Sequence, residues 1–427
     1  MSESANPVWY PFTQMKLAPS PIPIERAKDC TLYAKDGKTY IDAISSWWVN
    51  IHGHSNEIIA KAIAQQASTL EHVIFAGFTH SPAETIAQSL IQILPKGFSK
   101  IFFSDDGSTS VEVAIKMALQ FWHNQGITHK TKIIAFEHAY HGDTFGAMSV
   151  GERNTFTTPF QNHLFEVHFI PTPNDKNSEE VKNQLSALAQ SGKVAAFIFE
   201  PLVQGAGGML MYKAKHLDEL ISIAQQNNVL CIADEVMTGF GRTGKNFAIN
   251  HLTHSPDLIC LSKGITGGFL PMGVTACTQK IYDAFHSTEI TKTFFHGHSY
   301  TANPLTCAAA NASLEILLSD KCQRQLKTIE ESHQAFSEKI RNHDAVKEVR
   351  QTGTIIAVEL QTEENTSYFN SIRNQVYQFC LDEGVLLRPL GNIIYIMPPY
   401  CITEAELEKV YSVILKVIER VKAKSFR

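Results

Sequence analysis

The sequence predicts an α/β fold: a mostly parallel central sheet with helices on both faces, together with a smaller α+β domain. Two observations lead to this prediction. Short apolar runs alternate with longer helical patterns over roughly residues 60–310, and long charged helices with a few strands follow from Leu314 onward. Buried strands separated by helices are typical of a parallel sheet that is covered on both faces, so the first pattern indicates the larger domain.

The expected elements of the larger domain follow one another along the chain. The apolar runs that read as strands are KIFFS at 100–104, TKIIAF at 131–136, VAAFIFE at 194–200, VLCIAD at 229–234 and DLICLS at 257–262. Apolar residues at helical spacing predict helices at 111–122 and 216–226. In the first helix, the residues expected to face the sheet are Val111, Ala114, Ile115, Ala118 and Trp122.

The two ends of the chain predict the smaller domain. Asp36-Gly37 lies between two alternating segments, which is typical of a hairpin. After the charged helices come a strand at 354–360, a helix, the apolar segment 386–400 and a last helix from Glu404. We therefore expect three parts: 1–55, an N-terminal segment that joins the small domain and covers the active site; 56–310, the large domain; and 311–427, a C-terminal small α+β domain.

Composition and charge exclude several classes of partner. The net charge of −5 favours neither nucleic acid nor an anionic membrane, and the one basic run, which ends at Arg427, is short. The first eight residues lack the features of a secretory signal, and no apolar run reaches the length of a membrane span. The eight cysteines are scattered without metal-ligand spacing, so we expect free thiols, no metal and a cytoplasmic location.

Two polar motifs directly follow buried strands. Asp234 ends VLCIAD and runs into the glycine-rich loop EVMTGFGRTGK, where the carboxylate could serve chemistry at the sheet edge or simply cap the next segment. Lys263 follows DLICLS and precedes Gly264, Gly267 and Gly268. Most lysines are solvated surface charges, but this one is delivered by an apolar strand into a glycine-lined space. Desolvation there would lower its pKa, which Schiff-base chemistry requires.

The third motif is a helix start. KIFFS is followed by Asp105-Asp106, and Gly107-Ser108-Thr109 then opens the predicted helix. Free backbone N–H groups at such a start bind anions, although an N-cap without a ligand is the commoner case. The loop matches neither the Walker pattern nor a GxGxxG fingerprint. Together with Asp234 and Lys263 it fits pyridoxal 5′-phosphate (PLP): an anion site for the phosphate, a carboxylate for the ring nitrogen and an amine for the aldehyde.

Longer motifs carry a resemblance to a known family. The segments are ADEVMTGFGRTGK at 233–245 followed by Lys263, AYHGDTFGAMSVG at 139–151, EPLVQGAGGM at 200–209 and HGHSYTANPLTCAAA at 296–310. They resemble class III aminotransferases, a subgroup of the fold-type I PLP-dependent transferases. WYPFTQM at 9–15, DAISSWWVNIHGH at 42–54 and RPLGNIIYIMPPY at 388–400 resemble the branch that makes 7,8-diaminononanoate for biotin. The resemblance is collinear from about Trp9 to Tyr400.

The resemblance implies a role for each matching cofactor residue. Gly107 and Ser108 hold the phosphate, Tyr140 stacks on the ring, and Asp234 binds the ring nitrogen. Lys263 is both the Schiff base and the proton carrier, so Lys263, Asp234 and Tyr140 are the implied catalytic residues. His298 and Ser299 are expected to complete the phosphate site from the other subunit, which implies a homodimer with shared active sites.

Substrate residues are implied in the same way. Trp47, Trp48 and Phe12 are expected to line the pocket, together with Gly297 and Tyr395. Arg388 is expected to bind the carboxylate of 8-amino-7-oxononanoate, a task that suits its rigid fork of donors. Alternatives stay open for several of these residues. Paired tryptophans more often pack in a core or an interface, Tyr140 could be a core tyrosine, and Arg388 could be a surface charge. Arg242 and Asp143 could support the loop around the cofactor.

The expected reaction is a ping-pong transamination of 8-amino-7-oxononanoate. Relatives of this branch carry a tyrosine where this chain has Phe12, and some carry Pro-Thr in place of His298-Ser299. The amino donor is therefore open between S-adenosyl-L-methionine, which we expect, and lysine. Two rival functions remain: another class III ω-aminotransferase acting on a diamine or β-amino acid, and a non-catalytic PLP-fold binding protein. The intact Lys263, Asp234 and Gly107-Ser108 argue against the second.

Overall fold

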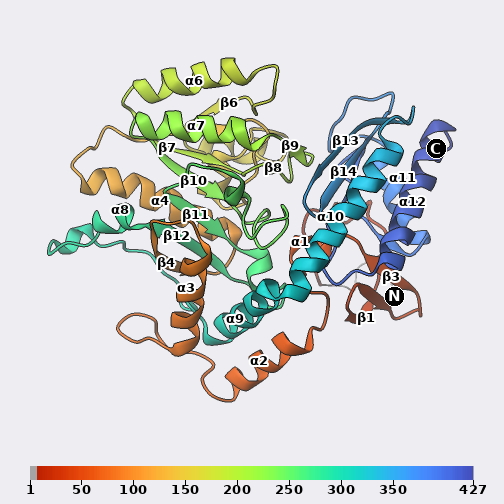
Figure 1. Ribbon diagram of the computed structural model, residues 1–427, viewed down its shortest axis with the longest axis horizontal. Coiled ribbons are helices and arrows are strands. Elements are labelled where there is room, and N and C mark those ends of the chain that lie inside the picture. The colour runs from red at the N-terminus through yellow and green to blue at the C-terminus, as the bar shows by residue number, and fades with distance from the viewer. Residues whose placement is uncertain (1–6, 427) are drawn as a thin grey trace.

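The computed structural model of the protein describes residues 7–426 (Figure 1). The first six residues of the predicted N-terminal segment, and Arg427 of the basic run, lie outside this range. Within it, no helix combines the length and the apolar character needed to span a bilayer.

The central sheet has seven strands in the order β4-β12-β11-β10-β7-β5-β6. They are β4 (Phe98–Ser104), β5 (Lys132–Phe136), β6 (Val167–Ile170), β7 (Val194–Phe199), β10 (Leu230–Asp234), β11 (Leu258–Leu261) and β12 (Gly273–Thr278). Every neighbouring pair from β11 to β6 is parallel, whereas β12 runs antiparallel to both β11 and β4. The predicted mostly parallel sheet is confirmed. The sequence patterns did not reveal β6 and β12.

Helices cover both faces of the sheet because its strands are apolar on both sides. In β5, Ile134 and Phe136 join the core cluster that contains the buried residues of α6 and α7, whereas Ile133 and Ala135 join the cluster of α4. The helices of this region are α2 (Glu57–Ala67), α3 (Ser81–Ile93), α4 (Gly107–Asn124), α5 (Phe145–Val150), α6 (Ser178–Gln190), α7 (Ala214–Gln226), α8 (Gln279–Asp283) and α9 (Pro304–Leu318). The predicted helices at 111–122 and 216–226 are α4 and α7, and the predicted sheet-facing residues of α4 are all buried.

The remaining elements gather beside the large sheet (Figure 1). Their helices are α10 (Asp320–Ile340), α11 (Ile372–Asp382) and α12 (Glu404–Lys422), and their antiparallel sheet consists of β13 (Val346–Thr352), β14 (Ile355–Leu360) and β16 (Ile393–Ile396). A second sheet joins the two chain ends: β1 (Ile24–Lys28), β2 (Thr31–Ala34), β3 (Thr39–Asp42) and β15 (Val385–Leu386). β15 pairs parallel with β3, so the N-terminal strands are tied to the C-terminal part of the chain.

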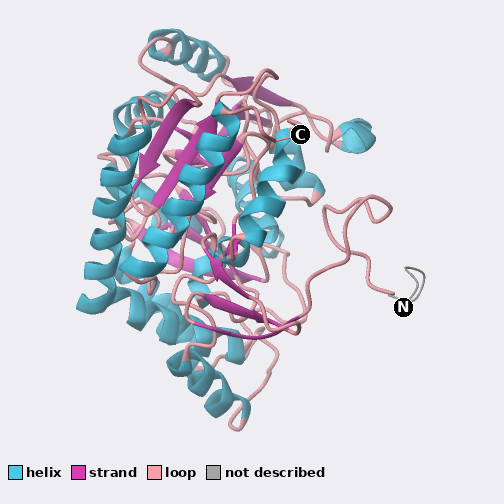
Figure 2. Ribbon diagram, turned by 90° about the vertical axis from the view of Figure 1, so that its right-hand side faces the viewer, coloured by secondary structure: helices cyan, strands magenta, loops and turns pink. Residues whose placement is uncertain are grey.

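Two details of the chain ends bear on the predictions. The hairpin expected at Asp36-Gly37 joins β2 to β3, and Gly37 adopts a positive φ of 87° that glycine tolerates best. The three-part division stays a prediction, and its expected boundary at 310/311 falls inside α9, which begins at Pro304 because Asn303 caps it. Before β1 the chain has no helix or strand in residues 7–23, and this arm extends away from the helices (Figure 2).

Candidate active site

A cavity of about 430 Å³ lies where the strands of the large sheet end. Asp234 closes β10, Lys263 follows β11, Glu200 follows β7 and Gly107 follows β4. The carboxyl ends of these strands meet at one sheet edge, which is where open α/β sheets bind ligands. The other residues that line the cavity include Trp47, Trp48, Ser108, Tyr140, His141, Gly142, Met237, Ser262 and Thr266. The structure thus brings together the three motifs that were predicted separately.

Lys263 is held in an unusual position at the end of β11. It opens the short 3₁₀ turn η4 (Lys263–Thr266), and its φ of 46° lies in the left-handed region. Such a conformation costs a non-glycine residue of the order of 1–3 kcal/mol, and it is kept where the surroundings determine it. Burial lowers the pKa of Lys263 to about 8, and Arg242 acts in the same direction, against Asp234 and Glu200. The amine is therefore far more often neutral than that of a surface lysine.

Asp234 is buried at the end of β10 and already has partners. His141 Nδ1 lies 2.7 Å from Asp234 Oδ2, and the backbone N–H of Val236 donates to Oδ1 at 3.0 Å. Nε2 of His141 is buried without a hydrogen-bond partner among the described residues. Because His141 fixes one carboxylate oxygen, Asp234 keeps a defined orientation toward the cavity.

Tyr140 and Glu200 form the neighbouring wall. The backbone N–H of Tyr140 donates to Glu200 Oε1 at 3.0 Å, and Gly205 N donates to Oε2 at 2.9 Å. The Tyr140 hydroxyl donates to Asp143 at 3.0 Å, and burial, then Asp143, raises the pKa of the phenol. Tyr140 is thus a half-buried residue of the cavity wall. Burial also raises the pKa of Glu200 to about 7, so this carboxyl lies poised between its two forms near neutral pH.

The start of α4 supplies donors at the cavity. Asp106 caps the helix in a capping box that uses the N–H of Thr109, and Gly107 and Ser108 of the first turn line the cavity. A Cβ at Gly107 would lie 2.7 Å from Val236 Cγ1, and one at Gly142 would lie 2.2 Å from Ser108 Oγ. No side chain fits at either position, so the backbone itself is the surface that a ligand meets there.

The tryptophans lie on a tight, distorted turn, α1 (Ser45–Trp48). Trp48 is buried, its Nε1 donates to the Tyr395 hydroxyl at 3.0 Å, and its ring centroid lies 4.7 Å from Lys263 Nζ. Trp47 is 42% exposed, and the guanidinium of Arg388 lies 4.6 Å from its ring centroid. Phe12 contacts the same ring at 5.6 Å between centroids. Trp47 and Trp48 thus line the cavity together with Lys263. Tyr395 contacts Trp48, and Arg388 and Phe12 contact Trp47, but these three residues are not part of the cavity lining.

Three predicted site residues lie elsewhere in the single chain. Gly297 and Ser299 are exposed on the loop before α9, and the half-buried His298 accepts a hydrogen bond from Tyr300 N at 3.2 Å. None of the three lines the cavity. Their predicted role in a second subunit's site is not tested by one chain.

Two functional positions were not assigned by the sequence reasoning. Glu200 occurs in a quoted motif, but only its contacts with Tyr140 and Gly205 reveal its place in the wall. Arg242, predicted only as a possible loop support, is fully buried and donates to Pro398 O at 2.8 Å and Trp48 O at 3.4 Å. Both residues could have been found from their positions in the sequence. Glu200 directly follows a buried strand, and Arg242 lies in a glycine-rich turn.

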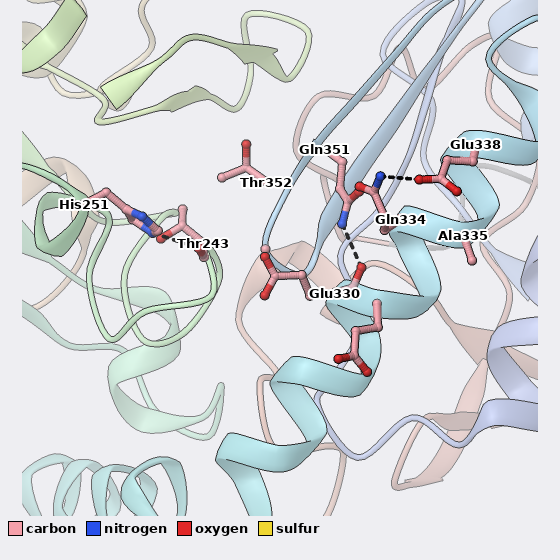
Figure 3. Close-up of a pocket in the computed structure, with 10 residues that line it drawn as sticks. Thr243, His251, Glu330, Gln334, Ala335, Glu338, Gln351 and Thr352 are labelled. Carbon is pink, nitrogen blue, oxygen red and sulfur yellow. Dashed lines mark hydrogen bonds between the residues drawn. The ribbon is translucent and has the colours of Figure 1, made fainter. Parts of the chain in front are cut away.

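A second cavity, of about 560 Å³, lies between α10, β13 and the loop after β10 (Figure 3). Gln351 Nε2 donates to the backbone oxygen of Glu330 at 2.9 Å, and Gln334 Nε2 donates to Glu338 at 2.7 Å. The hydroxyl of Thr243, a residue of the lining, is buried and has no hydrogen-bond partner among the described residues. Lined by glutamates and amides, the cavity lacks the lysine and helix start found at the first.

Comparisons with known proteins agree with the site. The family described as aminotransferase class-III matches residues 13–418. The adenosylmethionine-8-amino-7-oxononanoate aminotransferase of Synechococcus elongatus is 50% identical over 97% of this chain and 99% of that protein. The crystal structure of the enzyme of that name from Methanocaldococcus jannaschii has a TM-score of 0.92 at 34% identity, covering 98% of this chain and 97% of that one. A PLP-bound amine transaminase from an uncultivated Pseudomonas species has a TM-score of 0.90 at 29% identity, covering 97% and 99%. The chain therefore belongs to the class-III aminotransferase family, whose members work with pyridoxal 5′-phosphate.

Proposed function

We propose that the protein transfers an amino group to 8-amino-7-oxononanoate, giving 7,8-diaminononanoate for biotin biosynthesis. The observation that carries the chemistry is the meeting of Lys263, Asp234 and the α4 start in one cavity. The acceptor is supported by the printed names of the Synechococcus and Methanocaldococcus relatives. The free state of all eight cysteines fits a reducing compartment, so we place the reaction in the cytoplasm.

The cavity residues fit PLP. The crowded glycines at 107 and 142 leave only backbone and the Ser108 hydroxyl where a phosphate would meet the α4 dipole. The buried Asp234 suits a protonated ring nitrogen, the flat side chain of Tyr140 suits the ring, and the partly neutral amine of Lys263 suits the aldehyde. When bound, the cofactor supplies an electron sink for the pair left at the donor's α-carbon.

Lys263 is the group that moves a proton. With a pKa of about 8, its amine is neutral in an appreciable fraction near pH 7.5 and can accept the α-proton of the amino donor. Asp234, fixed by His141, keeps its charge directed at the ring side of the cavity. Glu200 fixes Tyr140 through the backbone, and the ring of Trp48 lies against the amine of Lys263 on one side of the cavity.

Both substrates would use the same pocket in turn, as a ping-pong transfer requires. Arg388, beside the exposed face of Trp47, is placed to bind the terminal carboxylate of the oxononanoate. The ring of Trp47 and that of Phe12 offer apolar surface for its carbon chain. For the donor we propose S-adenosyl-L-methionine, which the printed names of the relatives support. Lysine is the alternative, because Phe12 lacks the hydroxyl that a tyrosine at this position would offer to a donor.

We further propose a homodimer in which His298 and Ser299 reach the partner's phosphate site and Gly297 its substrate pocket. Large apolar side chains are exposed beside this loop, namely Ile74, Phe78, Phe295 and Tyr300. The arm at residues 7–23 also leaves Trp9 87% exposed. A second copy that covers these surfaces would bury apolar area and complete the site.

The decisive experiment supplies purified protein with 8-amino-7-oxononanoate and one donor at a time, and measures 7,8-diaminononanoate by mass spectrometry. We expect product with S-adenosyl-L-methionine. Product with lysine alone would change the donor, and turnover of simple diamines or β-amino acids in place of the oxononanoate would favour the rival ω-aminotransferase function. Absence of product with both donors would refute the biotin assignment.

Arg388→Ala is expected to raise KM for 8-amino-7-oxononanoate by about 100-fold, because loss of a charge-assisted fork leaves the substrate carboxylate unpaired. Arg388→Lys keeps the charge but not the fork and should lie between the two. The amino transfer from the donor alone, followed in a single turnover, tells whether Arg388 also binds the carboxylate of the donor, because both substrates use the same pocket. An unchanged KM for 8-amino-7-oxononanoate in Arg388→Ala would contradict the assignment.

A further inference from the structure

The turn that carries Trp47 and Trp48 has a backbone that its sequence does not favour. Ser45, Ser46 and Trp48 have φ values of 52°, 58° and 68°, and none of them is glycine. Non-glycine residues adopt such values only where the surrounding structure holds them there. Some group outside the turn must therefore stabilise it.

Asp42, at the end of β3, is that group. Its side chain is fully buried, and both oxygens are used. Oδ1 accepts the backbone N–H groups of Ile44 at 3.2 Å and Ser46 at 2.8 Å, while Oδ2 accepts the Ser46 hydroxyl at 2.9 Å and lies 2.8 Å from His54 Nε2. The backbone of His54 is fixed in turn by a bridge to Asp29.

Burial of the Asp42 carboxylate lowers the stability of the fold unless donors of the turn compensate for it. A buried carboxylate is strongly destabilising without compensating donors. Within residues 7–426, His54 is the one ionisable side chain at ion-pair distance from Asp42, so backbone and hydroxyl donors of the turn supply the rest. The carboxylate and the turn thus stabilise each other.

Further contacts transmit the shape of this turn to the site. The Ser45 hydroxyl donates to Met397 O at 2.9 Å, and Trp48 Nε1 donates to the Tyr395 hydroxyl at 3.0 Å. The result is the ring of Trp48 over Lys263 and the ring of Trp47 against Arg388. A change of φ at Ser46 would move both rings, because both follow it in the chain.

We propose that Asp42 is a positioning residue for the amino-transfer reaction: it holds the left-handed Ser45–Trp48 turn in the conformation that places Trp48 over Lys263 and Trp47 against Arg388. The substrate part of this inference rests on the proposed function, since it concerns the wall that the acceptor meets. The covering of Lys263 does not depend on which substrate is used.

The kinetic test compares Asp42→Asn, Asp42→Ala and the double variant Asp42→Ala/Ser46→Gly. Asparagine keeps the oxygen that accepts from Ile44 and Ser46, so its loss in kcat/KM should be about tenfold, against about 100-fold for alanine. Glycine at 46 takes up the positive φ without strain, so the double variant should regain about tenfold of that loss. Asp36→Asn, on the exposed hairpin of the same segment, is the matched control and should behave as wild type.

The second readout needs no substrate. The full-length chain, freed of cofactor, is mixed with PLP across a pH series, and the rate of covalent attachment gives the pKa of Lys263. The groups that face the amine, Asp234, Glu200 and Arg242, are unchanged in these variants. Displacement of the Trp48 ring removes part of the burial that lowers the pKa of Lys263, so in Asp42→Ala this pKa should rise from about 8 toward the ordinary 10.5 and should fall again in the double variant.

Melting temperature and circular dichroism establish which variants fold; if Asp42→Ala does not, Asp42→Asn is judged by the same readouts. Folded Asp42 variants with wild-type KM and an unshifted Lys263 pKa would overturn the proposal, as would a double variant no better than Asp42→Ala. If wild type itself gave no diaminononanoate, the proposed function would fail, while the attachment rates would still decide the role of Asp42.

Discussion

Lys263→Ala is expected to lower the rate of amino transfer by about 10⁴-fold, because the group that moves the α-proton of the donor is removed. The measurement is diaminononanoate formed per enzyme under saturating substrates. Borohydride treatment gives a second readout, since it fixes the cofactor to its lysine. The Lys263 peptide of wild type should then carry the cofactor mass, and the variant should carry none.

Two matched variants separate the amine's chemistry from its charge. Lys263→Arg keeps a cation but cannot release its proton near neutral pH, so it should be as inactive as alanine. Lys280, an exposed lysine just after β12, forms an ion pair with Asp257. The variant Lys280→Ala should keep full activity. Turnover by Lys263→Ala within tenfold of wild type would refute the proposed role.

The sequence indicated the residues that the structure brings into one cavity because strand ends are visible in it. Each buried strand is a short apolar run, and the polar residue that ends it stands out, as with Asp234 after VLCIAD and Lys263 after DLICLS. Since parallel strands end at one sheet edge, the sequence alone predicts that these residues, far apart in the chain, lie together. The α4 start was visible for the same reason.

Other features depend on tertiary contacts that leave no local pattern. β12 is a short run, GVTACT, in which a glycine and two threonines interrupt the apolar residues, and its place between β4 and β11 depends on these distant partners. The left-handed turn at Ser45–Trp48 contradicts backbone preference, because serine and tryptophan do not favour positive φ. Asp42 stabilises this turn, but in the sequence it is an aspartate at the end of a strand, like any capping residue. Strain of this kind becomes visible only when its supporting contacts are seen.

A second large effect is expected from Asp234→Asn, which should lower kcat/KM by about 10³-fold. The estimate follows from the roughly 10²–10³-fold loss of rate that is typical when one preorganised electrostatic group of an active site is removed. Asparagine has nearly the shape of aspartate, so the cavity should keep its form. What is lost is the negative charge that favours a protonated ring nitrogen, and with it the ability to hold electrons from the α-carbon.

The adjacent carboxylate offers an internal control for this prediction. Glu235 is as buried as Asp234, but it accepts hydrogen bonds from Thr238, Ala248 N and Ile249 N and does not line the cavity. Glu235→Gln should therefore lower the melting temperature while kcat stays within about threefold of wild type, since catalytic loss requires a group at the reacting atoms. Asp234→Asn should show the reverse, with a large loss in kcat and little change in melting temperature. The two neighbouring carboxylates would then have different roles, one in catalysis and one in stability, because their side chains point in different directions. If both variants lost activity equally, the effect would belong to folding of the loop, and Asp234 would have no special part in the chemistry.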